Sequence, residues 1–179
     1  MRILLVSGST RSGSTNRAAL RTIRDVAPDG VTAVLYEGLA ELPPFNPDDD
    51  FPPLPSVVAG LREQIAAADG LLFCTPEYAG ALPGSFKNLL DWTVGGAEMY
   101  GKPVAWVNVA AEGRGLNAHA SLATVLGYVG AAIIDPACAA VPVPRESVGP
   151  DGVIVDGPVR AALADVVRRF GAGLPGAPR

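Results

Sequence analysis

Short apolar segments alternate with amphipathic helical segments five times along this chain of 179 residues. The first apolar segment, Ile3–Val6, has no polar position, as expected of a central strand in a parallel sheet that is covered on both faces. A segment from about Thr15 to Ala27 then places apolar residues at helical spacing. Repetition of this unit predicts a three-layer α/β domain with a parallel sheet between two layers of helices.

The remaining elements follow the same pattern. Further strands are expected at residues 31–36, 71–75, 104–109 and 132–134, the last resuming near Val141. Further helices are expected from a cap at Ser56 to an end at Gly70, around 86–90, around 122–129, and over 159–170. Residues 37–55 are rich in proline and aspartate, which indicates a long surface loop. We therefore expect one domain over residues 1–170 and a frayed tail over 171–179.

Composition excludes several classes of protein. Hydrophobic residues make up 49% of the chain, which is too many for a disordered protein. No apolar run approaches the roughly 20 residues of a membrane span or the apolar core of a signal peptide, so we expect a soluble, cytoplasmic protein. The net charge of −4 and the presence of only two lysines, Lys87 and Lys102, argue against nucleic acid as a partner. Cys74 and Cys138 lie in separate apolar runs, which favours buried reduced thiols, and no metal-ligand spacing is present.

Ligands of open parallel sheets bind at the carboxyl ends of the strands. The loops that leave this edge are Gly8–Asn16, Pro76–Pro83 and Ala110–Asn117. The first of them nearly has the spacing of a triphosphate-binding loop, but Ser14 stands where such loops have lysine. Its hydroxyls, its amides at a helix N-terminus and Arg11 suit a single terminal monophosphate. An ordinary turn whose serine caps the helix is the alternative interpretation.

Two motifs give this chain a resemblance to a known family. In the first loop the matching residues are Gly8, Ser9, Arg11, Ser14 and Asn16. In the segment PEYAGALPGSFKNLLDW they are Pro76, Glu77, Tyr78, Pro83, Gly84, Lys87, Asn88, Asp91 and Trp92. The chain thus resembles the NADPH-dependent FMN reductases of flavodoxin-like fold, including their quinone and chromate reductase members. The resemblance implies a doubly wound, five-stranded parallel sheet in the order 2-1-3-4-5.

The resemblance also implies the residues of an FMN site. The phosphate and ribityl chain would contact Ser9, Arg11, Ser14, Thr15 and Asn16. The isoalloxazine ring would be lined, mostly through backbone groups, by Pro76, Glu77, Tyr78, Ala79 and Gly80. The third loop would contribute Glu112, Gly113, Arg114 and Gly115, with Arg114 a candidate for the phosphates of the nicotinamide nucleotide. Two positions depart from the family: Ala79 replaces the usual Asn, and the third loop reads AAEGRGLN instead of a paired-glycine stretch.

Other conspicuous residues receive structural interpretations. Lys87 and Asp91 have the i, i+4 spacing of an exposed ion pair. Trp92, Met99 and Tyr100 are interpreted as interface or core anchors. His119, the one histidine of the chain, is interpreted as a capping or surface residue rather than a catalytic one.

The function implied by the resemblance is an NAD(P)H-dependent FMN reductase. A hydride would pass from NADPH or NADH to N5 of FMN and then to a quinone, flavin, azo or similar acceptor, by ping-pong turnover. No catalytic protein residue is expected, because the flavin carries the chemistry. The resemblance further implies a homodimer or homotetramer. A flavodoxin-type electron carrier and a non-catalytic flavin-binding redox module are the alternatives.

Overall fold

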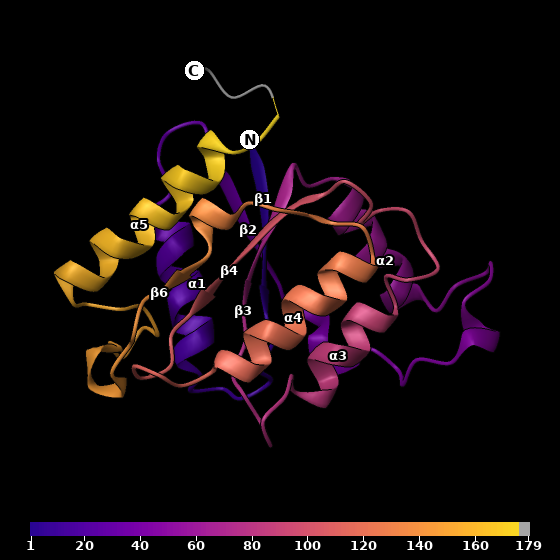
Figure 1. The fold of residues 1–179 in the computed structure, drawn as a ribbon, viewed down its shortest axis with the longest axis horizontal. Helices are drawn as coiled ribbons and strands as arrows, with labels where there is room; N and C mark the ends of the chain where they lie inside the picture. The colour runs from indigo at the N-terminus through magenta and orange to yellow at the C-terminus, as the bar shows by residue number, and fades with distance from the viewer. Residues whose placement is uncertain (176–179) are drawn as a thin grey trace.

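The computed structural model describes residues 1–175 and contains a parallel sheet between two layers of helices (Figure 1). Its strands are β1 (Arg2–Ser7), β2 (Thr32–Tyr36), β3 (Gly70–Cys74), β4 (Pro103–Asn108), β5 (Ala132–Ile133) and β6 (Ala139–Ala140). The sheet order is β2-β1-β3-β4-β5, and β6 also pairs with β4. The predicted strand order and flavodoxin-like fold are therefore confirmed.

Within residues 1–175, five α-helices cover the two faces of the sheet. They are α1 (Thr15–Asp25), α2 (Ser56–Ala66), α3 (Gly84–Asp91), α4 (Leu116–Tyr128) and α5 (Gly157–Ala172). Helices α1 and α5 bury one side of the sheet, where Leu20 and Phe170 join a single apolar cluster. Helices α2, α3 and α4 bury the other, where Leu61, Phe86 and Leu122 do the same. This division leaves the carboxyl ends of the strands open for a site.

Some predicted boundaries differ from those of the structure. Pro55, rather than Ser56, is the N-cap of α2, and Ser56 is the first helical residue. Gly70 does not end this helix but begins β3, where a Cβ would lie 2.7 Å from the Phe170 ring and 2.8 Å from the Pro103 carbonyl oxygen. Glycine is needed there because α5 packs directly on the strand.

The last predicted strand is interrupted. A 3-10 turn, η3 (Asp135–Ala137), separates β5 from β6, so the sheet has a sixth short strand where five were expected. Pro136 lies within this turn and has no amide hydrogen to continue the ladder. Both short strands remain parallel to β4.

At the C-terminus, α5 extends beyond its predicted end. Gly171 and Ala172 belong to the helix, and Leu174 packs in the same apolar cluster as Phe170. The expected frayed tail therefore does not begin at residue 171; its last four positions, 176–179, lie outside the described residues.

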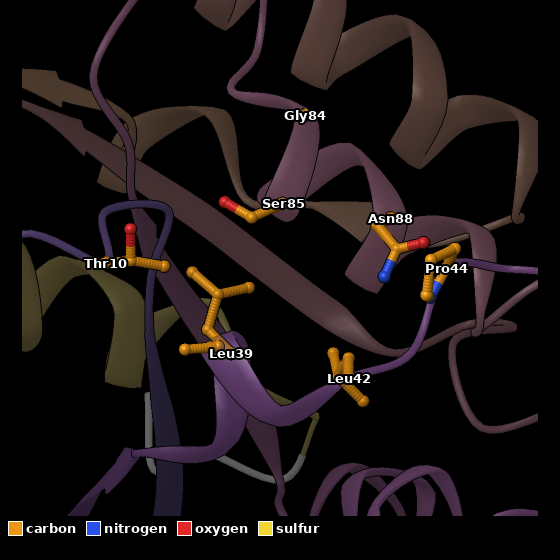
Figure 2. Close-up of a pocket in the computed structure, with 8 residues that line it drawn as sticks. Thr10, Leu39, Leu42, Pro44, Gly84, Ser85 and Asn88 are labelled. Atoms are coloured by element: carbon orange, nitrogen blue, oxygen red, sulfur yellow. The ribbon is translucent and has the colours of Figure 1, made fainter.

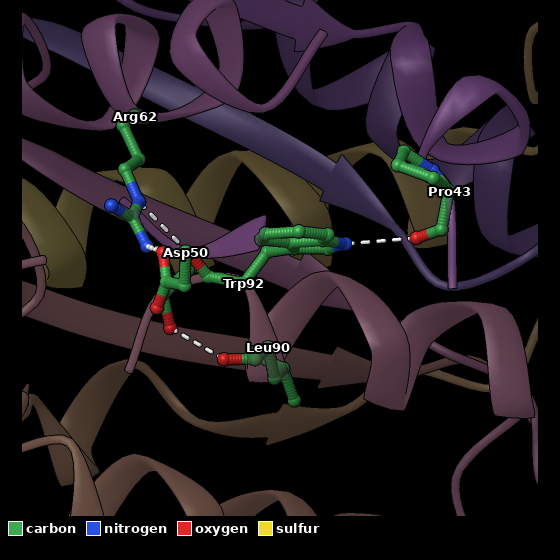
Figure 3. A network of polar contacts seen from close by, with 6 residues as sticks. Pro43, Asp50, Arg62, Leu90 and Trp92 are labelled. Atoms are coloured by element: carbon green, nitrogen blue, oxygen red, sulfur yellow. Dashed lines mark hydrogen bonds and ion pairs between the residues drawn. The ribbon is translucent and has the colours of Figure 1, made fainter. Parts of the chain in front are cut away.

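The long loop between β2 and α2 is anchored to the protein. It contains two 3-10 turns, η1 (Gly38–Glu41) and η2 (Pro47–Asp49). Figure 3 shows Arg62 of α2 donating from Nε (3.0 Å) and Nη2 (2.8 Å) to the Trp92 carbonyl oxygen, and from Nη2 to the Asp50 carboxylate (2.5 Å). The Trp92 indole in turn donates to the Pro43 carbonyl oxygen at 2.8 Å. Because these groups tie the loop to the end of α3, the loop is a fixed part of the structure.

The three residues interpreted as anchors have different positions. Trp92 and Met99 are buried in the core, whereas Tyr100 is 83% exposed. Lys87 and Asp91 form the expected i, i+4 ion pair at 2.5 Å.

Within residues 1–175, no helix has both the length and the apolar character needed to cross a bilayer.

Candidate functional site

Three loops meet at the carboxyl edge of the sheet. They follow β1, β3 and β4, which are direct neighbours in the sheet. A cleft of about 270 Å³ opens between them. Its lining residues are Thr15, Asn16, Thr75, Pro76, Glu77, Val109, Ala110, Arg114 and Gly115. The three loops predicted from the sequence therefore form one site.

The first loop presents a set of hydrogen-bond donors. The buried hydroxyl oxygens of Ser9 and Ser14 accept from the amides of Arg11 and Arg17, each at 3.4 Å, and Ser14 thereby caps α1. A hydroxyl that accepts still has its own hydrogen to donate. Within residues 1–175, the backbone amides of 12–16 donate to no protein acceptor. The loop can therefore hold an anion while Ser14 also stabilises the helix.

The start of this loop packs tightly against the end of β3. The Gly8 amide donates to the Cys74 carbonyl oxygen at 2.9 Å. A Cβ on Gly8 would lie 2.1 Å from the Thr75 hydroxyl oxygen. Glycine is therefore required here for a close approach. The sequence interpretation missed Thr75, because its partner lies 67 positions earlier and no local spacing links the two.

Beyond this point the first loop divides into an inner and an outer part. Thr15 and Asn16 line the cleft, and the Asn16 carboxamide oxygen accepts from the Cys74 thiol at 3.3 Å. Burial raises the pKa of the Cys74 thiol far above its ordinary value, so it stays protonated. Arg11 lies outside the lining of the cleft, is exposed, and forms no ion pair within residues 1–175.

The second loop ends in a tight turn. Tyr78 and Ala81 exchange two backbone hydrogen bonds of 3.0 Å, and the residues between them, Ala79 and Gly80, have φ of 50° and 75°. Positive φ at both central residues is typical of a type I′ turn, which favours Asn-Gly. Within the described residues, Ala79 is the only residue other than glycine with positive φ. Tyr78 is 54% exposed at the rim.

Two buried polar side chains, Asn108 of β4 and His119 of α4, hydrogen-bond to the third loop. The Asn108 carboxamide donates to the Arg114 carbonyl oxygen (2.7 Å) and accepts from the Ala110 amide (3.1 Å). His119 contacts the Gly115 carbonyl oxygen through Nδ1 at 2.6 Å. Because a carbonyl oxygen only accepts, Nδ1 carries the hydrogen. Gly115 has φ of 79°, and a Cβ there would lie 2.7 Å from the Asn108 oxygen.

The interpretation of His119 as a capping or surface residue was wrong. The side chain is buried on the inner face of α4, with its ring 6.3 Å from that of Trp106. Burial lowers the pKa of His119 below its ordinary 6.5, against the smaller opposing effects of the Gly115 carbonyl and the Glu77 carboxylate. His119 is therefore neutral at pH 7 and supports the third loop. A lone histidine at a helix start gave no sign of this role.

The predicted site residues fall into two groups. Those that line the cleft are Thr15, Asn16, Pro76, Glu77, Arg114 and Gly115. Those that lie in the same loops but outside its lining are Ser9, Arg11, Ser14, Tyr78, Ala79, Gly80, Glu112 and Gly113. All of these residues thus lie in the three loops around the cleft.

A second cleft, of about 410 Å³, lies on the outer side of the first loop (Figure 2). It is lined by Thr10, Leu39, Ala40, Leu42, Pro44, Gly84, Ser85 and Asn88. No charged side chain is among these residues. The cleft also lacks any contribution from the third loop, so the smaller cleft between all three loops is the better candidate for an anionic ligand.

The fold and the site together define a flavodoxin-like α/β protein whose first loop presents free backbone amides and serine hydroxyls at a helix N-terminus. Residues 1–144 match the family described as NADPH-dependent FMN reductase, and the chain belongs to this family. An NAD(P)H-dependent FMN reductase of Pseudomonas aeruginosa is 40% identical over 113 residues, which is 62% of this chain and 60% of that protein. A quinone reductase of Escherichia coli is 34% identical over 107 residues, 58% of this chain and 57% of that protein.

A solved structure extends the similarity to nearly the full length. It is FerB, a flavoenzyme NAD(P)H:(acceptor) oxidoreductase from Paracoccus denitrificans, with a TM-score of 0.81 and 27% identity. The match covers 94% of each chain. The alignments with the two curated relatives span less than two thirds of those proteins, 60% and 57% of their lengths.

Proposed function

We propose that this protein is an NAD(P)H-dependent FMN reductase that passes electrons to a quinone, flavin, azo or similar small acceptor. The donor set of the first loop is the observation that carries the proposal. Amides 12–16 and the hydroxyls of Ser9 and Ser14 suit a dianionic phosphate at the N-terminus of α1. The absence of lysine from residues 8–16 suits a monophosphate better than a triphosphate.

The rest of the site fits the other parts of FMN. Asn16 and Thr15 line the cleft, where their side chains suit the hydroxyls of a polyol chain, and residues of the second and third loops line it where a flat ring would bind. Glycines with positive φ, Gly80 and Gly115, allow the close backbone approach that a ring needs. When bound, FMN would supply the hydride- and electron-transfer chemistry.

In this proposal the residues of the chain bind and orient the flavin and the two substrates. We assign no general acid or base to the side chains that line the cleft: the Glu77 carboxylate accepts from backbone amides, and His119, which donates from Nδ1 to the Gly115 carbonyl oxygen, does not line the cleft. Arg114 is exposed at the edge of the cleft, where its guanidinium can bind phosphates of a nicotinamide nucleotide. Ping-pong turnover follows, because one open cleft serves both the electron donor and the acceptor in succession.

We further propose that the protein forms a homodimer, or a tetramer built from two dimers. Large apolar side chains near the Trp92–Tyr100 segment are exposed, namely Val94 at 61% and Tyr100 at 83%. Tyr100 lies against Gly130, two residues from Tyr128, which is 90% exposed. Light scattering should give at least twice the mass of one chain; a monomer at micromolar concentration would contradict this proposal.

Replacing Arg11 by Ala tests the phosphate assignment. We expect FMN affinity to fall by about tenfold to a hundredfold, because a charge-assisted hydrogen bond contributes about 1.5–3 kcal/mol. Riboflavin, which lacks the phosphate, should bind with unchanged affinity. The measurement is a titration of flavin-free protein with both ligands, with Arg168→Ala, an exposed arginine on α5, as the control. Equal losses for both ligands would mean that Arg11 acts on the ring or the fold instead.

A further inference from the structure

The Glu77 side chain joins two of the three loops. Its Oε2 accepts hydrogen bonds from the backbone amides of Asn117 (2.9 Å) and Ala118 (3.1 Å). These amides belong to the first turn of α4, 40 and 41 positions further along the chain. A residue of the second loop is thus bonded directly to the helix that the third loop enters.

This contact replaces a missing cap. The first amides of a helix have no partner within the helix, and a side chain at the N-cap ordinarily accepts from one of them. Ser14 does this for α1 and Asp156 for α5. The N-cap of α4 is Gly115, which has no side chain. Gly115 is fixed as glycine by its φ of 79° and its contact with Asn108, so the N-cap position itself cannot supply a side-chain acceptor.

The same contact faces the cleft. Glu77 lines it from the second loop, and Arg114 and Gly115 line it from the third. Nearby, the Asn117 carboxamide nitrogen lies 4.0 Å from the position that a Cβ on Gly80 would occupy, so the two loops are also close at the turn. Asn108 and His119 hold the third loop from within β4 and α4 themselves. Among these three side chains, only Glu77 bridges from one loop to the other.

We propose that Glu77 is a positioning residue, which fixes the separation of the second and third loops and thereby the width of the slot for a flat ring. This inference rests on the proposed binding of FMN. It assigns Oε2 of Glu77 to the α4 amides, so that this carboxylate oxygen acts on flavin binding by holding the two loops in position. What the two α4 amides require is an acceptor oxygen on a side chain as long as that of Glu77. The negative charge of the carboxylate contributes less to this contact.

Three variants test the proposal. Glu77→Ala removes the acceptor, Glu77→Gln keeps an acceptor oxygen at the same reach, and Asp156→Ala removes a comparable helix cap outside the residues that line the cleft. For Glu77→Ala we expect binding of FMN and of riboflavin to weaken equally, by about tenfold to a hundredfold. Glu77→Gln should stay within about threefold of the wild type, since it loses only the favourable charge at the helix N-terminus. Asp156→Ala should leave both affinities unchanged.

A second readout makes the test independent of flavin. Amide hydrogen exchange, followed by NMR in the flavin-free protein, should accelerate at Asn117 and Ala118 in Glu77→Ala and stay slow in Glu77→Gln. Unchanged flavin affinity in Glu77→Ala, or equal weakening in the Ala and Gln variants, would overturn the proposal. If the wild type binds no flavin, the proposed function fails, whereas the exchange rates still decide whether Glu77 caps α4.

Discussion

At the tip of the second loop, Ala79 adopts a left-handed backbone conformation with φ of 50°. Residues with a Cβ pay about 1–2 kcal/mol for this region, and Asn tolerates it better than Ala. The type I′ turn formed with Gly80 favours Asn-Gly in particular. The usual Asn of the family at this position therefore has an explanation in turn chemistry alone.

Replacing Ala79 by Asn should raise the free energy of unfolding by about 1 kcal/mol. Ala79→Val should lower it, because β-branched residues adopt positive φ with most difficulty. Urea unfolding of the flavin-free variants measures both changes. If Asn and Val shift stability in the same direction, the conformation of this turn is not as described.

Single residues show what sequence spacing can and cannot predict. Ser14 caps α1 and the Ser9 hydroxyl faces its loop, as a short local motif can indicate. Asn108 and Thr75 hold the same site but were missed, since their partners are a backbone carbonyl of another loop and a distant glycine. Such pairs form only after the strands are side by side. The role of His119 was missed for the same reason, because it depends on which face of α4 is buried.

Among the elements, the loop between β2 and α2 departs most from expectation. Its proline-rich composition correctly indicates the absence of a long helix or strand, but it conceals the buried ion pair between Asp50 and Arg62. Helix boundaries were less predictable than helix positions: the N-cap of α2 is Pro55 rather than Ser56, and Ser56 is already the first helical residue. Strand order came from the family resemblance and not from any local pattern.

The two ion pairs of this region should contribute unequally to stability. Asp50 and Arg62 are each 10% exposed in their side chains, so Asp50→Ala leaves a buried guanidinium without its carboxylate. We expect a loss of about 3 kcal/mol in the free energy of unfolding. Lys87→Ala, which breaks the exposed pair with Asp91, should cost less than about 1 kcal/mol. Urea unfolding of both variants makes the comparison; similar small losses would show that Asp50 does not anchor the loop.

For the whole molecule, His119 links stability to pH. Its pKa is lowered by burial, so below pH 6.5 the unfolded chain binds a proton that the folded chain resists. The free energy of unfolding should therefore fall as pH drops below about 6.5, by at most about 1.4 kcal/mol per pH unit, until the folded pKa is reached. His119→Gln should lose this dependence. Since the chain has one histidine, identical slopes for the two proteins between about pH 5.5 and about 6.5, just below the ordinary histidine pKa, would contradict the assignment.

The family and the architecture leave one central claim to test, that the three-loop cleft binds FMN and lets NAD(P)H reduce it. The most direct measurement is the visible spectrum of the FMN-loaded protein before and after addition of NADPH without oxygen. We predict that the flavin absorption disappears on addition and returns when a quinone is admitted. A flavin spectrum that stays unchanged with both NADPH and NADH would contradict the account.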